Sequence, residues 1–472
     1  MELLTVFGPP GTGKTTCLLS LILEELKTTP PNRLAFVSYT KQGTYEGAKR
    51  AHEQFNLTGN DTPFFRTIHS LCFRELGMRK YDMLQTQHYK IFSEKIGIPF
   101  TGYYTQDYNS PNDEYLHAIS MERHNPKLAL YMSRSMDAAK YDYIKFNYAA
   151  IKKQLGIKDF DDLLEDYIQH CKPFDIDVAF VDEAQDLTPL QWRVIKHMFK
   201  NANKIVVAGD DDQAVYEWAG ADIQQFLNFS KKSMTLQKSY RLPEKIRLAA
   251  HNVSKDIMVR KQKKFISNGT TGEIDRAGSL CNVHRNLNDW GGELIIARTN
   301  YRLRQLCEEL EMLGVYHIRK GFNCVEPLIL KGINTYKEYM ADKCDINSVK
   351  KFGNLFKQVD KITPWQKAID KPPDRVAFYE RMFANGSLDK EPVKLETFHS
   401  SKGTENDHVI ISPDLSTRVY NEFHNQRDSE LRCLYVGMTR TKNKLTMLAP
   451  QWKNTYPSKY FALRQTKLRK AT

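Results

Sequence analysis

The sequence lacks the features of membrane and secreted proteins. Its longest mostly apolar stretch, around Cys17–Leu23, is far shorter than the ~20 residues that cross a bilayer. The opening MELLTVFGPP has no basic segment ahead of an apolar one, which argues against a secretory signal. The eight cysteines are scattered, and no pair has the CxxC spacing of a zinc ribbon. We therefore expect a cytoplasmic protein in a reducing compartment, without membrane association and without a disulfide scaffold.

Acidic residues are missing from the end of the chain. No Asp or Glu follows Glu430, whereas ten Lys and Arg residues do. The chain has 69 basic and 56 acidic residues, hence a net charge of +13, so everything before this stretch carries only +3. A local excess of this kind suits a polyanion such as a nucleic acid or a nucleotide. A solvated tail is the alternative interpretation, above all for Lys467–Lys470.

Short apolar runs recur along the 472 residues, a length typical of about three domains. Each run is bounded by polar turns, and helical stretches such as Lys14–Leu26 and Leu187–Lys200 lie between several of them. The pattern predicts an α/β fold with buried parallel strands. The expected strands are Leu3–Phe7, Leu34–Val37, Val178–Val181, Ile205–Ala208, Leu294–Ala297, Val409–Ile411 and Leu445–Leu448.

Two regions lack this alternation of apolar strands and helical stretches. Residues 77–165 are rich in Tyr and Lys and show no clear series of strands. Residues 312–390 look helical and loop-like and contain Pro364, Pro372 and Pro373. We interpret both regions as mostly helical insertions into the α/β framework.

The segment from Gly8 to Thr15 fits the pattern GxxxxGK[ST], directly after an apolar run and at the start of a helical stretch. Glycines let several backbone N–H groups point at one phosphate, and a helix N-terminus favours negative charge. Lys14 should reach the β- and γ-phosphates, and the Thr15 hydroxyl should ligate Mg²⁺. A Gly-Pro turn without a ligand is the alternative. The residues expected to bind ATP here are Gly8, Pro9, Gly11, Thr12, Gly13, Lys14, Thr15 and Thr16.

A second apolar run ends in two adjacent carboxylates, Asp182 and Glu183. Asp182, at the end of the strand, is placed to hold Mg²⁺, and Glu183 to polarise an attacking water as general base. The alternative is a polar cap between strand and helix, with Asp186 or Thr188 as the N-cap residue.

These two segments, with eight others in the same order, resemble the motifs of superfamily 1 helicases of the UvrD/Rep/PcrA type. The resemblance extends from residue 5 to about residue 449 and leaves out the insertions. Beyond Gly8–Thr15 and Asp182–Asp186, it rests on Phe36–Lys41 ("TFTNKA"), Thr67–Ser70 ("TFHS"), Asp159–Leu164 ("DFDDLL"), Gly209–Ala221 ("GDxDQSIYxWRGA"), Ser239–Arg241 ("NYR"), Arg298–Asn300 ("YRTNAQSR"), Thr397–Glu405 ("THxAKGLE") and Tyr435–Arg440 ("YVGITRA").

The resemblance implies two RecA-like domains with ATP in the cleft between them. The first domain would comprise residues 1–76 and 166–238, with 77–165 as its insertion. The second would comprise residues 239–311 and 391–472, with 312–390 as its insertion.

The resemblance also implies roles for single residues at the nucleotide. Arg241 and Arg440 match two arginines that stabilise charge on the γ-phosphate during hydrolysis. Gln213 matches the residue that senses this phosphate. Tyr240 matches an aromatic residue that stacks on the base, and Glu405 matches a residue near the ribose.

Single-stranded DNA is implied to cross both domains. Aromatic side chains stack on bases without regard to sequence. Taken singly, an aromatic residue is more often part of a core, and His69 has the alternative of a satisfied core histidine. The DNA-binding residues implied by the resemblance are Tyr39, Thr40, His69, Tyr216, Trp218 and His399. The first insertion is either a further DNA-facing surface or a helical packing unit.

The chain departs from the family pattern in three places. Only seven residues precede Gly8, so we expect the adenine-reading Gln segment of the family to be absent. Glu217 and Ala219 replace two common arginines, which removes a phosphate or interdomain contact. The second insertion is short, and Trp452 or Tyr456 stands where the family has a strand-separating hairpin. The compact size would suit an enzyme of a phage or a mobile element.

The sequence thus predicts an ATP- and Mg²⁺-dependent DNA helicase that moves 3′→5′ on single-stranded DNA and unwinds duplex, as a monomer acting at duplex junctions. A first alternative is a translocase that displaces proteins or remodels recombination intermediates with little unwinding. A second, from another class, is a P-loop phosphotransferase on a small molecule. A third is a DNA-binding scaffold without hydrolysis.

Overall fold

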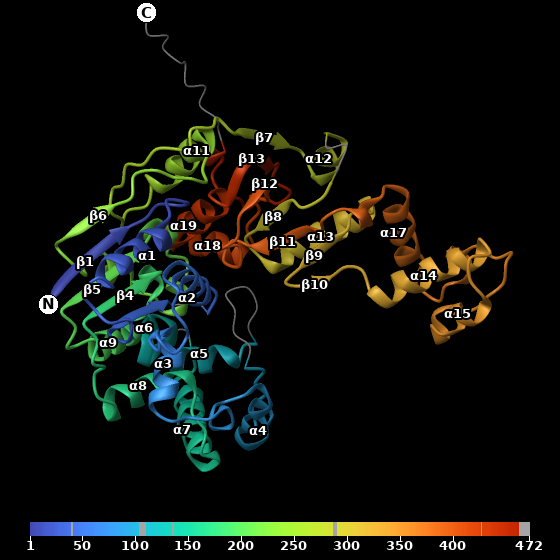
Figure 1. The fold of residues 1–472 in the computed structure, drawn as a ribbon. Helices are drawn as coiled ribbons and strands as arrows, with labels where there is room; N and C mark the ends of the chain where they lie inside the picture. Colours follow the sequence, from blue (N-terminus) through green and yellow to red (C-terminus); the bar gives the residue numbers. More distant parts are fainter. Residues whose placement is uncertain (39–40, 103–109, 135, 287–289, 426, 462–472) are drawn as a thin grey trace, which may run out of the picture. The chain divides into compact units, whose positions relative to one another are not determined.

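The chain packs as two compact units. The computed structural model describes residues 1–38, 41–102, 110–134, 136–286, 290–425 and 427–461 (Figure 1). Unit 1 comprises Met1–Arg241, Ile257–Asn268 and Asp428–Arg432. Unit 2 comprises Leu242–Asp256, Gly269–Arg427 and Cys433–Thr472. Residues 239–241, 257–268 and 428–432, which the sequence interpretation assigns to the second domain, thus pack with unit 1.

Unit 1 is built on a sheet of six parallel strands in the order β3-β2-β4-β5-β1-β6. The central strands are almost wholly buried, as the apolar runs predict. Their carboxyl ends meet at one edge, where ligands bind in open α/β sheets. The strands are β1 (Glu2–Phe7), β2 (Leu34–Ser38), β3 (Phe65–Thr67), β4 (Val178–Asp182), β5 (Lys204–Gly209) and β6 (Ser233–Thr235).

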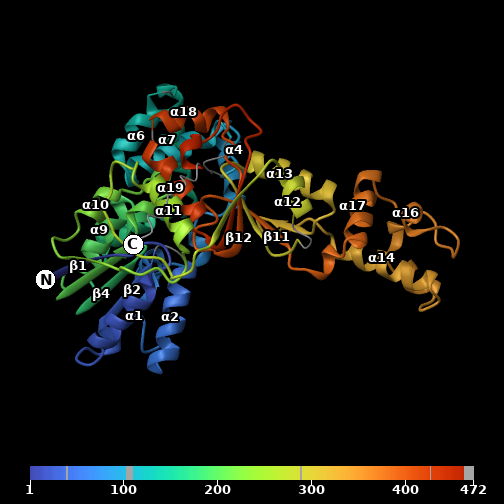
Figure 2. The same cartoon turned by 90° about the horizontal axis from the view of Figure 1, so that it is seen from above.

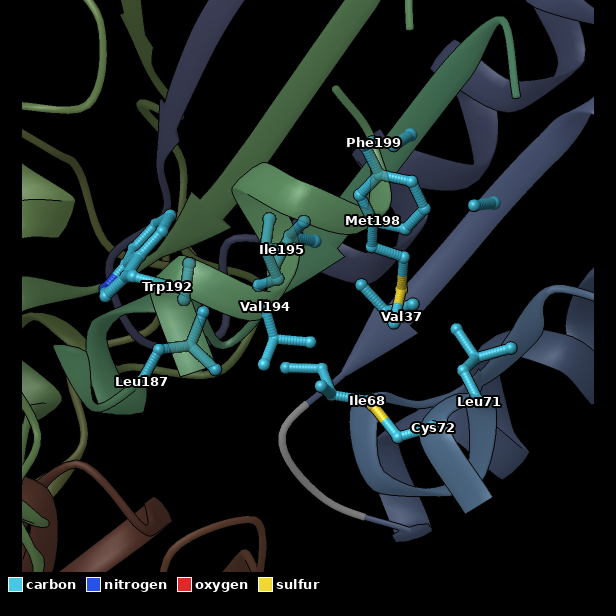
Figure 3. Close-up of a cluster of buried hydrophobic side chains, with 14 of the residues drawn as sticks. Val37, Ile68, Leu71, Cys72, Leu187, Trp192, Val194, Ile195, Met198 and Phe199 are labelled. Carbon is cyan, nitrogen blue, oxygen red and sulfur yellow. The ribbon is translucent and has the colours of Figure 1, made fainter. Parts of the chain in front are cut away.

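Helices cover both faces of this sheet, because successive strand residues point to opposite sides. On one side, Val6 and Phe36 pack with Leu18 and Ile22 of α1 (Lys14–Glu25). The other face is covered in part by α3 (Ile68–Glu75) and α9 (Pro189–Met198), whose side chains meet over Val37 (Figure 3). The remaining helices outside the first insertion are α2 (Lys41–Phe55) and α10 (Ile223–Leu227).

The first insertion is helical in its described residues and has its own apolar core. Phe92 of α4, Ile119 of α5 and Ile144 of α7 are buried in it. Figure 1 shows these helices gathered beside α8, which leads back into the sheet at β4. The helices are α4 (Thr86–Ile96), α5 (Asp113–His124), α6 (Pro126–Ser133), α7 (Ala138–Leu155) and α8 (Phe160–His170).

Unit 2 contains a seven-stranded sheet in the order β10-β9-β11-β8-β12-β13-β7. All pairs are parallel except the β9–β10 hairpin. The strands are β7 (Glu273–Ala277), β8 (Leu294–Ala297), β9 (His317–Arg319), β10 (Phe322–Asn323), β11 (Val393–Thr397), β12 (Asn406–Ile411) and β13 (Thr441–Leu448). The helices that accompany them are α11 (Glu244–Ser254), α12 (Leu280–Asn286), α13 (Asn300–Leu313), α18 (Thr417–Asn425) and α19 (Arg427–Met438).

The second insertion packs around a separate core in which Ile333, Tyr336, Trp365 and Tyr379 are buried. Figure 2 shows the helices of this insertion grouped together. It follows the β9–β10 hairpin and ends before β11. Its helices are α14 (Pro327–Met340), α15 (Ile346–Lys350), α16 (Trp365–Ala368) and α17 (Pro373–Ala384).

The predicted fold class is confirmed: two α/β units with parallel sheets carry helical insertions. All seven apolar runs form strands. Five agree with the expected bounds to within one residue, whereas β12 and β13 begin three and four residues earlier than expected. The sequence interpretation did not find strands such as β6 and β7, because they are short or largely exposed and lack an apolar run. In the part of the chain that the structure describes, no helix has the length and apolar character needed to cross a membrane.

Candidate nucleotide site

The loop between β1 and α1 forms a backbone cradle. Gly11 and Gly13 have φ angles of 69° and 76°, a left-handed conformation that favours glycine. Gly13 is the N-cap residue of α1, and the first turn of that helix carries no acidic side chain. Thr12 closes the loop by donating its hydroxyl to the Pro9 carbonyl over 2.7 Å. The N-terminal N–H groups of α1, where Thr15 and Thr16 lie, are thereby offered to an anion.

Lys14 folds back over the start of this loop. Its Nζ donates to the Gly8 carbonyl over 3.2 Å and lies 3.8 Å from Glu183 Oε1. A Cβ on Gly8 would come within 2.0 Å of Lys14 Cγ, so only glycine leaves room for the lysine side chain. The ammonium group therefore lies above the cradle, where its charge can meet a bound phosphate.

The end of β4 brings the two predicted carboxylates to the loop. The Thr15 hydroxyl donates to Asp182 Oδ2 over 3.2 Å, and the Glu183 N–H donates to Asp182 Oδ1 over 2.9 Å. Mg²⁺ prefers oxygen ligands, and Thr15 and Asp182 supply two neighbouring ones. Burial raises the pKa of Asp182 to about 6, and the charge of Glu183 adds to this rise, whereas Lys14 and the two hydrogen bonds oppose it. A cation at this position would favour the ionised carboxylate.

Glu183 has an unusual backbone for a residue with a side chain. Its φ angle of 53° lies in the left-handed region. Gln185 Nε2 donates to Glu183 Oε2 over 2.6 Å and holds the carboxylate in place. The same Gln185 side chain accepts a hydrogen bond from the Asp210 N–H over 3.1 Å, beyond the end of β5. Gln213 then donates from Nε2 to Asp210 Oδ2 over 2.7 Å. A continuous chain of hydrogen bonds thus joins the predicted general base to the predicted phosphate sensor.

Residues 239–241 lie against the phosphate loop within unit 1. The Tyr240 N–H donates to the Gly11 carbonyl over 2.8 Å, and the Ser239 hydroxyl donates to the Pro10 carbonyl over 2.8 Å. A Cβ on Gly11 would come within 2.3 Å of Arg241 Cβ. The Tyr240 ring is exposed, with Lys238 Nζ 5.5 Å from its centre. The structure therefore brings Arg241 and Tyr240 to the cradle.

Arg440 and Glu405 belong to unit 2. Arg440 is buried, and its guanidinium donates to the carbonyls of Val436 over 3.0 Å and Thr404 over 3.3 Å. Glu405 is exposed, and its Oε1 lies 2.7 Å from Lys442 Nζ. Both side chains make these contacts inside unit 2. Glu405 directly precedes β12, and Arg440 directly precedes the neighbouring strand β13.

The expected DNA-binding residues of unit 1 differ in their surroundings. Tyr39 and Thr40 lie outside the described residues. Trp218 and Tyr216 are half-buried, and the Trp218 ring lies 6.4 Å from the His117 ring of the first insertion. His69 lies edge-on to Phe160 at 5.5 Å, and burial lowers its pKa to about 4, with a further lowering by His124. His69 is therefore neutral at pH 7.

His399, the expected DNA-binding residue of unit 2, is buried. Its Nε2 lies 3.4 Å from the Cys433 sulfur. Burial lowers the pKa of His399 well below its ordinary value, and the charges of Arg298 and Lys402 lower it further. This imidazole is neutral, so it offers a hydrogen bond rather than a charge.

The two candidates for a strand-separating side chain differ in exposure. Tyr456 is 1% exposed, and its ring packs against Phe398 and Phe423, with centres 6.0 Å apart in both pairs. Trp452 is half-buried beside Tyr301. Tyr456 is therefore a core residue of unit 2 in this structure.

A cluster of buried charges next to Gln213 was not found from the sequence. Three consecutive aspartates after β5 are buried, and Lys263 lies among them. Arg432 donates to Glu217 Oε2 over 2.9 Å, so Glu217, one of the departures from the family pattern, has a cationic partner. The sequence did contain a signal for this cluster, namely the run Asp210–Asp212. Consecutive carboxylates that are buried need cations nearby, so the run indicated basic partners from elsewhere in the chain.

The glycine cradle, the lysine above it and the carboxylates at the neighbouring strand end define a P-loop nucleotide-binding protein. Sequence comparison points to one family within this class. The family described as UvrD/REP helicase N-terminal domain matches residues 2–234.

Curated relatives agree with this family. The ATP-dependent DNA helicase PcrA of Staphylococcus aureus is 27% identical over 414 residues, which are 75% of this chain and 54% of that protein. PcrA of Bacillus subtilis is 26% identical over 404 residues, with 75% and 53% covered. A probable DNA helicase II homolog of Mycoplasma capricolum is 26% identical over 298 residues, with 57% and 41% covered. The chain is similar to UvrD/Rep/PcrA proteins and spans about half the length of these relatives.

Among solved structures, the helicase of PRRSV matches with a TM-score of 0.37 and 10% identity, over 96% of this chain and 53% of that one.

Proposed function

We propose that this protein is an ATP- and Mg²⁺-dependent DNA motor that moves 3′→5′ along single-stranded DNA and unwinds duplex DNA. We also propose that it acts in the cytoplasm. The observation that supports it most is the hydrogen-bonded connection from Glu183 through Gln185 and Asp210 to Gln213. A small-molecule kinase has no use for a general base tied to a phosphate sensor. The relatives named ATP-dependent DNA helicases support the choice of DNA as the track.

The residues of the site have different roles in ATP hydrolysis. Lys14 and the N–H groups of the loop hold the phosphates, and Thr15 and Asp182 hold the metal ion. Mg²⁺, when bound, would offset the negative charge of the phosphates. Glu183 accepts a proton from the attacking water, and Lys14 Nζ lies 3.8 Å from its Oε1. Gln213, Arg241 and Arg440 are proposed to stabilise the charge that develops during cleavage.

The test is ATP hydrolysis with and without an oligonucleotide, followed by unwinding of duplexes that carry a 3′ or a 5′ tail. We expect DNA to stimulate hydrolysis and only the 3′-tailed duplex to be unwound. Turnover that is indifferent to DNA would favour the phosphotransferase alternative, and binding without turnover would favour the scaffold.

Lys14→Ala should abolish DNA-stimulated hydrolysis, because the ammonium above the cradle is removed, while DNA binding is largely retained. Lys27→Ala is the matched control, since Lys27 follows the same helix and is exposed. Hydrolysis rates and DNA affinity measured on both variants check this prediction. Retained turnover in Lys14→Ala would contradict the assignment of the site.

The burial of Tyr456 favours a second candidate function, a translocase with little unwinding. A side chain packed in the core of unit 2 is not available to separate strands in this conformation. Translocation and fork unwinding, measured side by side on the same preparation, distinguish the two functions.

A further inference from the structure

Three consecutive aspartates, Asp210, Asp211 and Asp212, lie buried just beyond β5 and share one cation. Lys263 Nζ lies 2.8 Å from Asp210 Oδ1 and 3.1 Å from Asp212 Oδ2, and it also donates to Asp211 Oδ1. An ammonium group has three protons, so each proton can point at one carboxylate. Burial alone would lower the pKa of Lys263, but the charges of the three aspartates outweigh it and raise the pKa. Lys263 is therefore charged at neutral pH.

Asp210 connects this lysine to the proposed phosphate sensor. One carboxylate oxygen, Oδ1, accepts from Lys263, and the other, Oδ2, accepts from Gln213 Nε2 over 2.7 Å. The Asp210 N–H is held by Gln185, whose own amide holds Glu183. Lys263 and the Asp212 N–H, which donates to the same oxygen over 3.2 Å, thus hold the carboxylate that accepts from Gln213.

Lys263 belongs to the 257–268 segment, which leaves unit 2 after Asp256 and packs with unit 1. Near its start, Arg260 Nε donates to Asp212 Oδ1 over 2.7 Å, and the Lys261 N–H donates to Asp211 Oδ2 over 2.6 Å. The segment is therefore fastened to all three positions around Lys263 by side-chain and backbone donors.

The far end of the 257–268 segment supports Arg241. The Ser239 N–H donates to the Ile266 carbonyl over 2.9 Å, and Asn268 Nδ2 donates to the Arg241 carbonyl over 3.1 Å. Gln213 and Arg241 are the two residues of unit 1 proposed to meet the γ-phosphate. The 257–268 segment therefore contacts both: it reaches Gln213 through Lys263 and Asp210, and it binds the backbone carbonyl of Arg241.

We propose that Lys263 is a positioning residue for γ-phosphate recognition, acting through Asp210 on Gln213. The inference rests on the proposed function, because it assumes that Gln213 senses the γ-phosphate. The competing explanation is that Lys263 only neutralises buried charge. The two explanations predict different affinities when Lys263 is replaced. If Lys263 positions Gln213, the affinity for a nucleoside triphosphate falls and the affinity for a diphosphate does not. If Lys263 only neutralises buried charge, its loss damages the site generally and both affinities fall.

The experiment measures the affinity of the full-length chain for ADP and for a non-hydrolysable ATP analogue, together with kcat and KM for ATP. The variants are Lys263→Met and, because removing one cation among three carboxylates can prevent folding, the charge-balanced pair Lys263→Met with Asp211→Asn. Lys264→Met is the matched control, since Lys264 is the exposed neighbour in the same segment. Gln213→Ala serves as the reference for loss of the sensor.

We expect the folded Lys263 variants to lose about tenfold or more of the preference for the ATP analogue over ADP, the size of one hydrogen bond to a charged group. The affinity for ADP should stay within about twofold, kcat should fall, and Lys264→Met should behave as the original chain. Combining Lys263→Met with Gln213→Ala should add little, because both changes remove the same interaction.

An unchanged preference in the charge-balanced pair, or an equal loss for both nucleotides, would overturn the inference. If Gln213→Ala itself leaves the preference intact, the assignment of the sensor fails and this inference fails with it. If the original chain shows no DNA-stimulated hydrolysis yet Lys263→Met still loses the preference, the inference stands and the proposed motor function fails.

Discussion

Glu183 combines a strained backbone with a carboxylate held by two neighbours. A residue with a side chain at φ 53° costs of order 1–3 kcal/mol, and such strain often coincides with function. Gln185 fixes one carboxylate oxygen, and Lys14 lies near the other. This geometry orients the side chain toward the cradle. The helix cap that the sequence offered as the alternative is also present, because Thr188 is the N-cap residue of α9 and its hydroxyl accepts from the Gln191 N–H over 3.2 Å.

Glu183→Gln should lower kcat for ATP hydrolysis by about 10²-fold or more, the usual effect of removing a general base. Affinity for ATP should change little, because the amide keeps the shape of the side chain. Steady-state kinetics and nucleotide titration check both parts. Glu24→Gln on the exposed face of α1 is the control, and a similar kcat in the two variants would refute the role of Glu183.

Asp182→Asn should raise the melting temperature more at pH 8 than at pH 5. Burial raises the pKa of Asp182 to about 6, so ionising this carboxyl destabilises the folded state. The penalty is absent below about pH 4, develops as the pH rises through about 6, and is complete above it. We expect a gain on the order of 3 °C at pH 8 without Mg²⁺, measured by thermal denaturation.

The control for this experiment is Asp142→Asn, which changes an exposed carboxyl on α7. A gain in Asp182→Asn that is independent of pH would show that ionisation of Asp182 is not the cause.

At the level of elements, the phosphate loop and residues 239–241 form one assembly. A backbone hydrogen bond joins Tyr240 to Gly11, and the Ser239 hydroxyl donates to the Pro10 carbonyl. The close approach of Arg241 to Gly11 requires that the loop residue have no side chain. The position of Arg241 thus depends on a glycine more than 200 residues earlier in the sequence.

Gly11→Ala should weaken ATP binding about tenfold or more and lower hydrolysis. The left-handed backbone costs an alanine about 1–2 kcal/mol, and its Cβ would overlap Arg241 Cβ at 2.3 Å. Nucleotide titration and a melting curve separate the local effect from unfolding. Gly59→Ala is the control, because nothing lies within 4 Å of a Cβ there; equal affinities in the two variants would contradict the close packing.

At the level of the whole molecule, the chain passes between the two units several times. It crosses after Arg241, Asp256 and Asn268, and α19 contributes Asp428–Arg432 to unit 1 and residues from Cys433 onward to unit 2. Arg440 lies two residues after the end of α19. A motor that couples hydrolysis to domain motion would have to accommodate that motion at these crossings.

DNA affinity should fall steeply with salt, because a chain of net charge +13 that contacts phosphates releases counterions. Between 50 and 200 mM salt we expect at least about a tenfold loss for a single strand. Fluorescence anisotropy with an oligonucleotide measures it, and an uncharged peptide nucleic acid of the same sequence is the control. A flat response to salt would show that the basic residues do not form the track.

The sequence by itself determined the nucleotide loop, the carboxylates after β4 and the seven main strands. These features are local: glycine spacing, adjacent charges and apolar runs lie within a few residues of one another. The motif order also led to the helicase family, which the comparisons support. The domain bounds and the individual binding roles remain predictions.

Only the tertiary structure decided which groups the chain brings together across long separations. Lys263 meets aspartates some fifty residues earlier, and Arg432 meets Glu217 more than two hundred residues earlier. His399 and Tyr456 resemble functional residues in sequence but are buried in the fold. The physical reason is that burial and charge pairing depend on distance in space, which spacing along the chain does not encode.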